Sequence, residues 1–144
     1  MTAVGHARVS TSRMRWGRII VGGILLEGGL LVIAVPILAF VPNPFSGPAT
    51  GGADFTAFYA SVAAACFVAG LLGGAWVSRA VVSARVLHGA LSGIIATLIY
   101  LAICSVPPNS IAMVAAGYGL AVFIAINTLR IAGATVGAAF AGRR

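Results

Sequence analysis

The sequence predicts an all-α integral membrane bundle of four transmembrane helices, with both termini in the cytoplasm. Apolar residues make up 60% of the 144 residues and charged residues only 8%, whereas soluble domains carry about 25% charged residues. The chain contains four long apolar runs, and a run of about 20 residues crosses a bilayer core about 30 Å thick. A soluble globular domain and a disordered chain are both excluded by this composition.

Residues 1–15 are polar and basic, and they predict a disordered cytoplasmic tail before a single membrane domain over residues 16–144. Met14 offers an alternative translation start inside this tail. The first predicted span covers about residues 19–41. Trp16 stands at its basic end, where interfacial aromatic residues are common.

Residues 42–54 contain several prolines and glycines but no lysine or arginine, which is typical of a loop. The second predicted span follows at about 55–77, and Asp54 is placed to cap its N-terminus. A short basic connection at 78–85 leads to the third span at about 86–106. A second loop without basic residues then begins at Pro107.

The fourth apolar run covers about residues 111–140 and is longer than one span requires. Two arrangements are open for it. Either the helix is long and tilted, or it leaves the membrane near Arg130.

Every basic residue of the chain is an arginine, and most arginines stand at the ends of apolar runs. Arginine-rich connections stay preferentially in the cytoplasm, so the tail, the 78–85 connection and the C-terminus are expected on that side. This position also argues against a nucleic-acid partner, which the net charge of +7 alone would allow. The arginines are Arg8, Arg13, Arg15, Arg18, Arg79, Arg85, Arg130, Arg143 and Arg144.

Glu27 is the only acidic residue within a predicted span, and it lies about 13 Å beyond Arg18 along the helix. Its expected counterpart is Arg130, which shares a predicted helix face with Asn127 and with small residues. Three interpretations are open: a structural Glu27–Arg130 ion pair, a protonated and hydrogen-bonded Glu27, or a proton- or cation-binding carboxylate in a transport path. Ionisable residues inside a membrane are costly and by default raise a functional hypothesis.

Pairs of glycines four residues apart recur in three of the spans, and residues at this spacing share a helix face. Such faces let helix backbones approach closely in lipid. They either build the bundle itself or bind a second copy or another membrane protein. The six glycines are Gly70, Gly74, Gly89, Gly93, Gly133 and Gly137.

The inventory of reactive side chains predicts no enzyme, no cofactor and no metal site. Asp54 and His88 are expected on opposite sides of the membrane, so they cannot share a catalytic centre with a nucleophile. The cysteine and histidine residues form no cluster with metal-ligand spacing. His88 is expected to be an interfacial side chain with access to water.

Two segments resemble known membrane proteins. The string Gly73-Gly74-Ala75-Trp76-Val77-Ser78-Arg79, followed by His88-Gly89-Ala90-Leu91-Ser92-Gly93, resembles small four-span bacterial membrane proteins to which no activity is assigned. This resemblance implies a bacterial inner-membrane location and the same topology.

The segment Ile24-Leu25-Leu26-Glu27-Gly28-Gly29 is similar to the first helix of small multidrug-resistance transporters. In that family, a membrane-embedded glutamate couples proton movement to cationic drug transport. Gly28-Gly29 stands where that family usually has a Gly-Thr pair, and the 42–54 loop is longer than that family's loops. The similarity therefore concerns the placement of Glu27 alone.

Two functional hypotheses follow. The first is a non-enzymatic structural or interaction role in the lipid bilayer, through small-residue helix faces that engage a second copy or another membrane protein. The alternative is a small proton-coupled transporter with Glu27 as the proton- or cation-binding carboxylate.

Overall fold

The computed structural model describes residues 14–42, 55–81, 83–106 and 111–141, and every regular element in these residues is a helix. Four of the five helices are long and apolar enough to cross a membrane, which confirms the predicted all-α class with four candidate spans. A helix suits this environment because it satisfies its backbone hydrogen bonds internally. Residues 1–13 of the predicted tail and Asp54 lie outside the described residues. The helices are α1 (Trp16–Phe40), α2 (Thr56–Ser78), α3 (Arg85–Cys104), α4 (Ile111–Tyr118) and α5 (Leu120–Ala141).

The fourth apolar run differs from the prediction, because it forms two helices instead of one. Gly119 separates α4 from α5 with a φ of 76°. This left-handed backbone conformation is open to glycine at little cost and interrupts the helix. The single helix predicted over 111–140 is therefore wrong, and α5 continues through Arg130 to Ala141.

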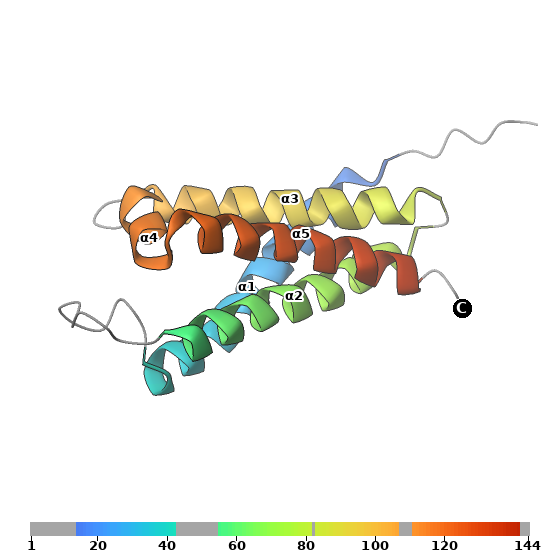
Figure 1. The fold of residues 1–144 in the computed structure, drawn as a ribbon. Coiled ribbons are helices and arrows are strands. Elements are labelled where there is room, and N and C mark those ends of the chain that lie inside the picture. The colour runs from blue at the N-terminus through green and yellow to red at the C-terminus, as the bar shows by residue number, and fades with distance from the viewer. Residues whose placement is uncertain (1–13, 43–54, 82, 107–110, 142–144) are drawn as a thin grey trace, which may run out of the picture.

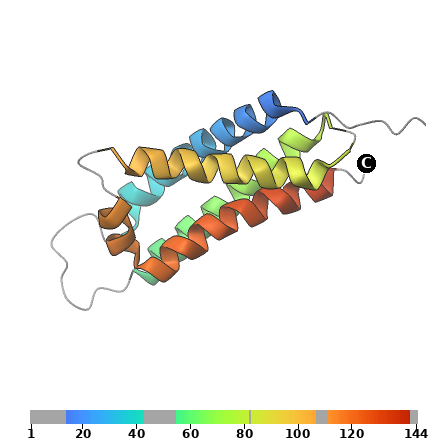
Figure 2. The same cartoon turned by 90° about the horizontal axis from the view of Figure 1, so that it is seen from above.

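The helices lie close together at one end of the bundle and separate toward the other. The start of α1 and the end of α5 lie at the close end, while α4 lies at the open end (Figures 1 and 2). The most extensive interface joins α2 to α5, and α3 packs against α5 from another side. Helix α1 packs on α2 and α3.

An arginine joins α1 to α2 at the close end. Arg18 of α1 donates hydrogen bonds to the carbonyl oxygens of Trp76 (3.0 Å) and Val77 (3.4 Å), at the end of α2. The Arg18 guanidinium also lies 4.6 Å from the centre of the Trp76 ring. These contacts satisfy carbonyl groups that the last turn of a helix leaves without an intrahelical donor.

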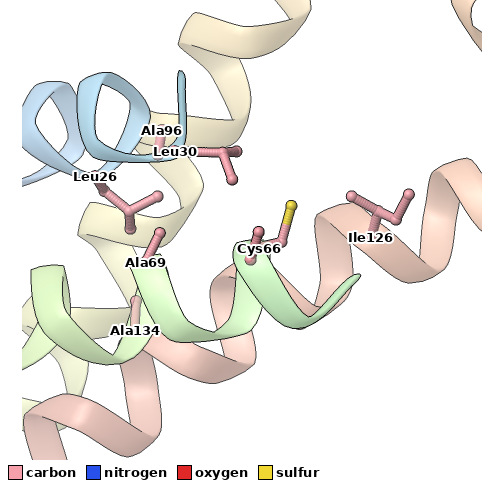
Figure 3. Packing of buried hydrophobic residues seen from close by; sticks show 8 residues of the cluster. Leu26, Leu30, Cys66, Ala69, Ala96, Ile126 and Ala134 are labelled. Atoms are coloured by element: carbon pink, nitrogen blue, oxygen red, sulfur yellow. The ribbon is translucent and has the colours of Figure 1, made fainter. Parts of the chain in front are cut away.

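The apolar core lies where the four spanning helices meet (Figure 3). Small side chains from α2, α3 and α5 fill most of it, together with Ile126 of α5 and two leucines of α1. The cluster contains Leu26, Leu30, Ala65, Cys66, Ala69, Ala96, Ile126 and Ala134.

Glycines allow the backbones of α2 and α5 to come into direct contact. A Cβ atom on Gly70 would stand 2.6 Å from the Arg130 carbonyl oxygen, and one on Gly74 would collide with the carbonyl of Ala134. From the other side, Cβ atoms on Gly133 and Gly137 would collide with the carbonyls of Phe67 and Leu71. Neither helix could carry a side chain at these positions without moving its neighbour.

The α3–α5 interface uses the remaining two predicted packing glycines. A Cβ atom on Gly89 would collide with Ala138 and with the Ala134 carbonyl, and one on Gly93 would stand 2.8 Å from the Ile131 Cα. All six glycines therefore lie against other helices of the same chain. The interpretation that they build the bundle itself agrees with this packing.

We expect Gly137→Ala to destabilise the protein by about 1–3 kcal/mol, the usual cost of forcing extra atoms into a packed interior. The new Cβ would meet the backbone of Leu71, which cannot rotate away as a side chain could. Gly28→Ala is the matched control, since a Cβ on Gly28 meets nothing within 4 Å. Thermal unfolding in detergent compares the two variants, and equal melting temperatures would contradict the proposed role of close packing.

Candidate functional site

A buried ion pair joins α1 to α5 in the interior of the bundle. The Arg130 Nη1 atom lies 3.1 Å from the Glu27 Oε2 atom, and the side chains are 1% and 5% exposed. The structure thus brings together the two ionisable residues that the sequence singled out. Neither charge could be buried here without its partner, because an isolated ion in an apolar interior is very costly.

The position of Arg130 follows from the glycines on either side of it. Its carbonyl oxygen lies 2.6 Å from the place of a Cβ on Gly70 of α2 and 3.5 Å from that of a Cβ on Gly93 of α3. The α5 backbone is therefore held between two helices at the level of Arg130. The side chain reaches Glu27 on α1.

Two further side chains contact the guanidinium group. The centre of the Tyr100 ring lies 4.6 Å from the Arg130 Cζ atom, a cation–π distance. The Arg130 Nη2 atom donates a long hydrogen bond of 3.9 Å to the Cys66 sulfur. The guanidinium thus contacts a carboxylate, an aromatic ring and a thiol, each from a different helix.

The ion pair leaves polar atoms unsatisfied. Among the described residues, no acceptor meets hydrogen-bond geometry at Arg130 Nε or Nη1, and no donor meets it at Glu27 Oε2. Glu27 and Arg130 attract each other as charges but do not form an aligned hydrogen bond. Buried polar atoms without partners are uncommon in folded proteins, and they often mark a functional group.

Asn127 lies one turn before Arg130 on α5 but bonds to its own helix. Its Nδ2 atom donates to the Phe123 carbonyl oxygen at 2.8 Å. Its Oδ1 atom is buried and has no partner in the described part of the chain. The sequence grouped Asn127 with the ion pair, and the structure gives it no bond to either member.

An apolar pocket of about 170 Å³ lies beside the ion pair. Glu27 and Arg130 supply its charged groups, and Tyr100 and Tyr118 its hydroxyl groups. Aliphatic side chains from α1, α2, α3 and α5, together with Phe58, cover most of the remaining wall. These residues include Leu30, Leu31, Ala34, Ile37, Leu38, Val62, Ile103 and Ile126.

Aromatic rings gather at the α4 side of the pocket. The rings of Phe58 and Tyr118 stack with their centres 6.0 Å apart and their planes 13° apart. Tyr59 packs beside Tyr118 with a centre-to-centre distance of 6.3 Å. Tyr100, Tyr118 and Phe58 were not predicted as pocket residues. The signal was weak, because aromatic residues near span ends are also typical of an interfacial belt.

His88 is buried, which corrects the expectation that water reaches it: the residue is 2% exposed. Its Nε2 atom accepts a hydrogen bond from the Arg15 backbone N–H at 3.2 Å, so its Nδ1 atom carries the proton and donates to the Ala84 carbonyl oxygen at 2.9 Å. Ala84 has a φ of 54°, an uncommon conformation for alanine. His88 therefore has a structural role at the α2–α3 connection.

In the described residues, no group of three or more histidine, cysteine or acidic side chains lies close enough together to hold a metal ion. No protein-family model, curated protein or solved structure matches the chain.

We expect unequal losses of stability when either member of the ion pair is removed. Breaking a buried pair costs about 3–5 kcal/mol, because it leaves one charge without a partner. Arg130→Gln should cost less than Glu27→Gln, since an orphaned glutamate can take up a proton and an orphaned arginine cannot lose one. Chemical unfolding in detergent measures both variants and the double variant.

The double variant should be more stable than Glu27→Gln alone, because it carries no unpaired charge. Additive losses in the double variant would show that the two side chains do not interact, and would contradict the ion pair.

Proposed function

We propose that this protein is a small proton-coupled transporter of the bacterial inner membrane, with both termini in the cytoplasm and Glu27 as the carboxylate that exchanges the proton. The observation that carries the proposal is the Glu27–Arg130 pair at the wall of an apolar pocket inside the bundle. The proposed activity is non-enzymatic and uses no cofactor.

The location of the pair favours transport over simple structural support. Ionisable residues inside a membrane typically mark the paths of ions and substrates. Small-molecule sites are concave and mostly apolar, with few polar groups that fix the orientation of the ligand. The pocket has this character. Its two charged groups are Glu27 and Arg130, whose ion pair protonation of Glu27 would break.

Protonation of Glu27 would remove the charge that holds the Arg130 side chain. The guanidinium would then be available to another partner in the pocket, and loss of the proton would restore the original pair. Binding of a proton and binding of a substrate are thereby linked at one place. Such linkage is what coupled transport requires.

The structural or interaction hypothesis finds less support. It rested on six glycines as candidate contact faces, and all six pack against helices of the same chain. Self-association and binding of another membrane protein stay predictions that would have to use other surfaces.

The first test is whether Glu27 exchanges protons. The chain has only two acidic side chains, so an Asp54→Asn variant leaves Glu27 as its sole side-chain carboxyl group. We expect the infrared carboxyl band of this variant to titrate within about two pH units of neutrality, where a group that moves protons must work. The band should vanish in Glu27→Gln with Asp54→Asn. A Glu27 that stays ionised down to about pH 4 would indicate a permanent ion pair and support the structural hypothesis instead.

The second test is transport itself. Transport of two probes into proteoliposomes with an imposed pH gradient is measured separately. The probes are ethidium, an organic cation, and radiolabelled benzoate, an organic anion. We expect the gradient to drive flux of one of these probes above the level of protein-free liposomes. The flux should be lost in Glu27→Gln and retained in Asp54→Asn. Equal flux in the wild type and Glu27→Gln would contradict the proposal.

A further inference from the structure

The charge balance of the pocket restricts what can bind there. Glu27 and Arg130 together carry no net charge, and they lie 3.1 Å apart. A cation approaching Glu27 would meet the guanidinium, and an anion approaching Arg130 would meet the carboxylate. Each of these ligands would experience a like charge in a region where charge interactions are only weakly screened.

A neutral ligand that can give up a proton avoids this penalty. We propose that the pocket binds a small apolar carboxylic acid, which enters uncharged and is held as its carboxylate by Arg130. The acid transfers its carboxyl proton to the Glu27 carboxylate, which becomes a neutral carboxyl group. The carboxylate formed from the ligand replaces Glu27 as the partner of Arg130, and the total charge of the site is unchanged. This inference rests on the proposed proton exchange at Glu27.

The guanidinium has the donors that this exchange needs. Arg130 is 1% exposed, and neither its Nε nor its Nη1 has an acceptor with hydrogen-bond geometry among the described residues. A carboxylate is the preferred partner of a guanidinium, because the two groups form strong charge-assisted hydrogen bonds. The face of the guanidinium is already covered by Tyr100, so a ligand would bind at the edge.

The rest of the pocket indicates the size and polarity of the ligand. Its volume of about 170 Å³ is below the roughly 300–1,000 Å³ of sites for drug-sized molecules. Leu30, Ile126 and Phe58 line it with apolar groups. The ligand class is therefore a short-chain or single-ring monocarboxylic acid.

The test uses the full chain in detergent, with benzoate as the acid and benzamide and benzylamine as its neutral and cationic counterparts. Calorimetry in buffers of different ionisation enthalpy measures proton uptake. At a pH above the pKa that the infrared titration gives for Glu27, where free benzoate is also ionised, we expect uptake of about one proton per benzoate bound, and an affinity that falls about tenfold per pH unit as the pH rises. Benzamide and benzylamine should not bind.

The variants give opposite results for the two members of the pair. Arg130→Gln should lose benzoate binding. Glu27→Gln leaves the guanidinium without a partner, so it should bind benzoate more tightly than the wild type, with no proton uptake and no dependence on pH. Benzoate should also raise the melting temperature of Glu27→Gln by more than that of the wild type, since it restores a partner to Arg130.

Two alanine-to-phenylalanine variants test the proposal even if Glu27→Gln does not fold. Ala34 lines the pocket and does not contribute to the ion pair, so Ala34→Phe should fill the pocket and weaken benzoate binding at least tenfold. Ala64→Phe is the control on an exposed position of α2. Equal affinity in these two variants would overturn the proposal.

The remaining outcomes separate this inference from the proposed function. Benzoate binding without proton uptake, or with unchanged strength in Arg130→Gln, would overturn the inference. Flux of ethidium that depends on Glu27, in a protein that does not bind benzoate, would overturn the inference and leave proton-coupled transport standing. A Glu27 that never takes up a proton would remove both.

Discussion

The close approach of the α2 and α5 backbones is the constraint on which the rest of the structure depends. Helix association in lipid receives little help from the hydrophobic effect, so it relies on packing and on polar contacts between helices. Gly70, Gly74, Gly133 and Gly137 provide that packing, because each lies where a side chain would meet the backbone of the opposite helix. The same contact fixes the height and direction of Arg130, whose carbonyl group lies against Gly70.

The placement of the glycines also explains why a pocket exists. The six packing glycines lie between Arg130 and the close end of the bundle, where the helices meet. Beyond Arg130, toward α4, α2 and α5 carry larger residues on the pocket side, such as Val62, Phe58 and Ile126. Helices α2 and α5 separate in that direction (Figure 1). The ion pair lies at the transition between the tight half and the open half, so one side of it is packed and the other borders a cavity.

Much of the fold could be predicted from the sequence, because length and hydropathy determine whether a helix can span a membrane. The approach of Glu27 and Arg130 was also predictable, since the helical rise places them about 13 Å and about 19 Å deep, and the long arginine side chain can cover the difference. Other features depend on tertiary structure. The division at Gly119 could not be told apart from a glycine tolerated within a helix, and the burial of His88 depends on where the Arg15 backbone lies. The contact of Tyr100 with Arg130 requires the rotation of α3 about its axis, which depth alone does not give.

The arrangement of α1 gives the ion pair a significance beyond its own energy. Helix α1 packs on α2 and α3, and the Glu27–Arg130 contact links it to α5 across the interior. A change in the charge of Glu27 would therefore alter the attraction between α1 and α5 while leaving the glycine contacts of α2, α3 and α5 untouched, since those contacts depend on shape and not on charge. Helices α2, α3 and α5 thus form a scaffold whose contacts do not depend on protonation. Helix α1 is joined to α5 by an ion pair that protonation of Glu27 would remove.

A buried pair of this kind contributes little net stability compared with apolar residues of similar size. In the proposed transporter, the value of the pair is its response to protonation, which an apolar contact at the same place could not provide.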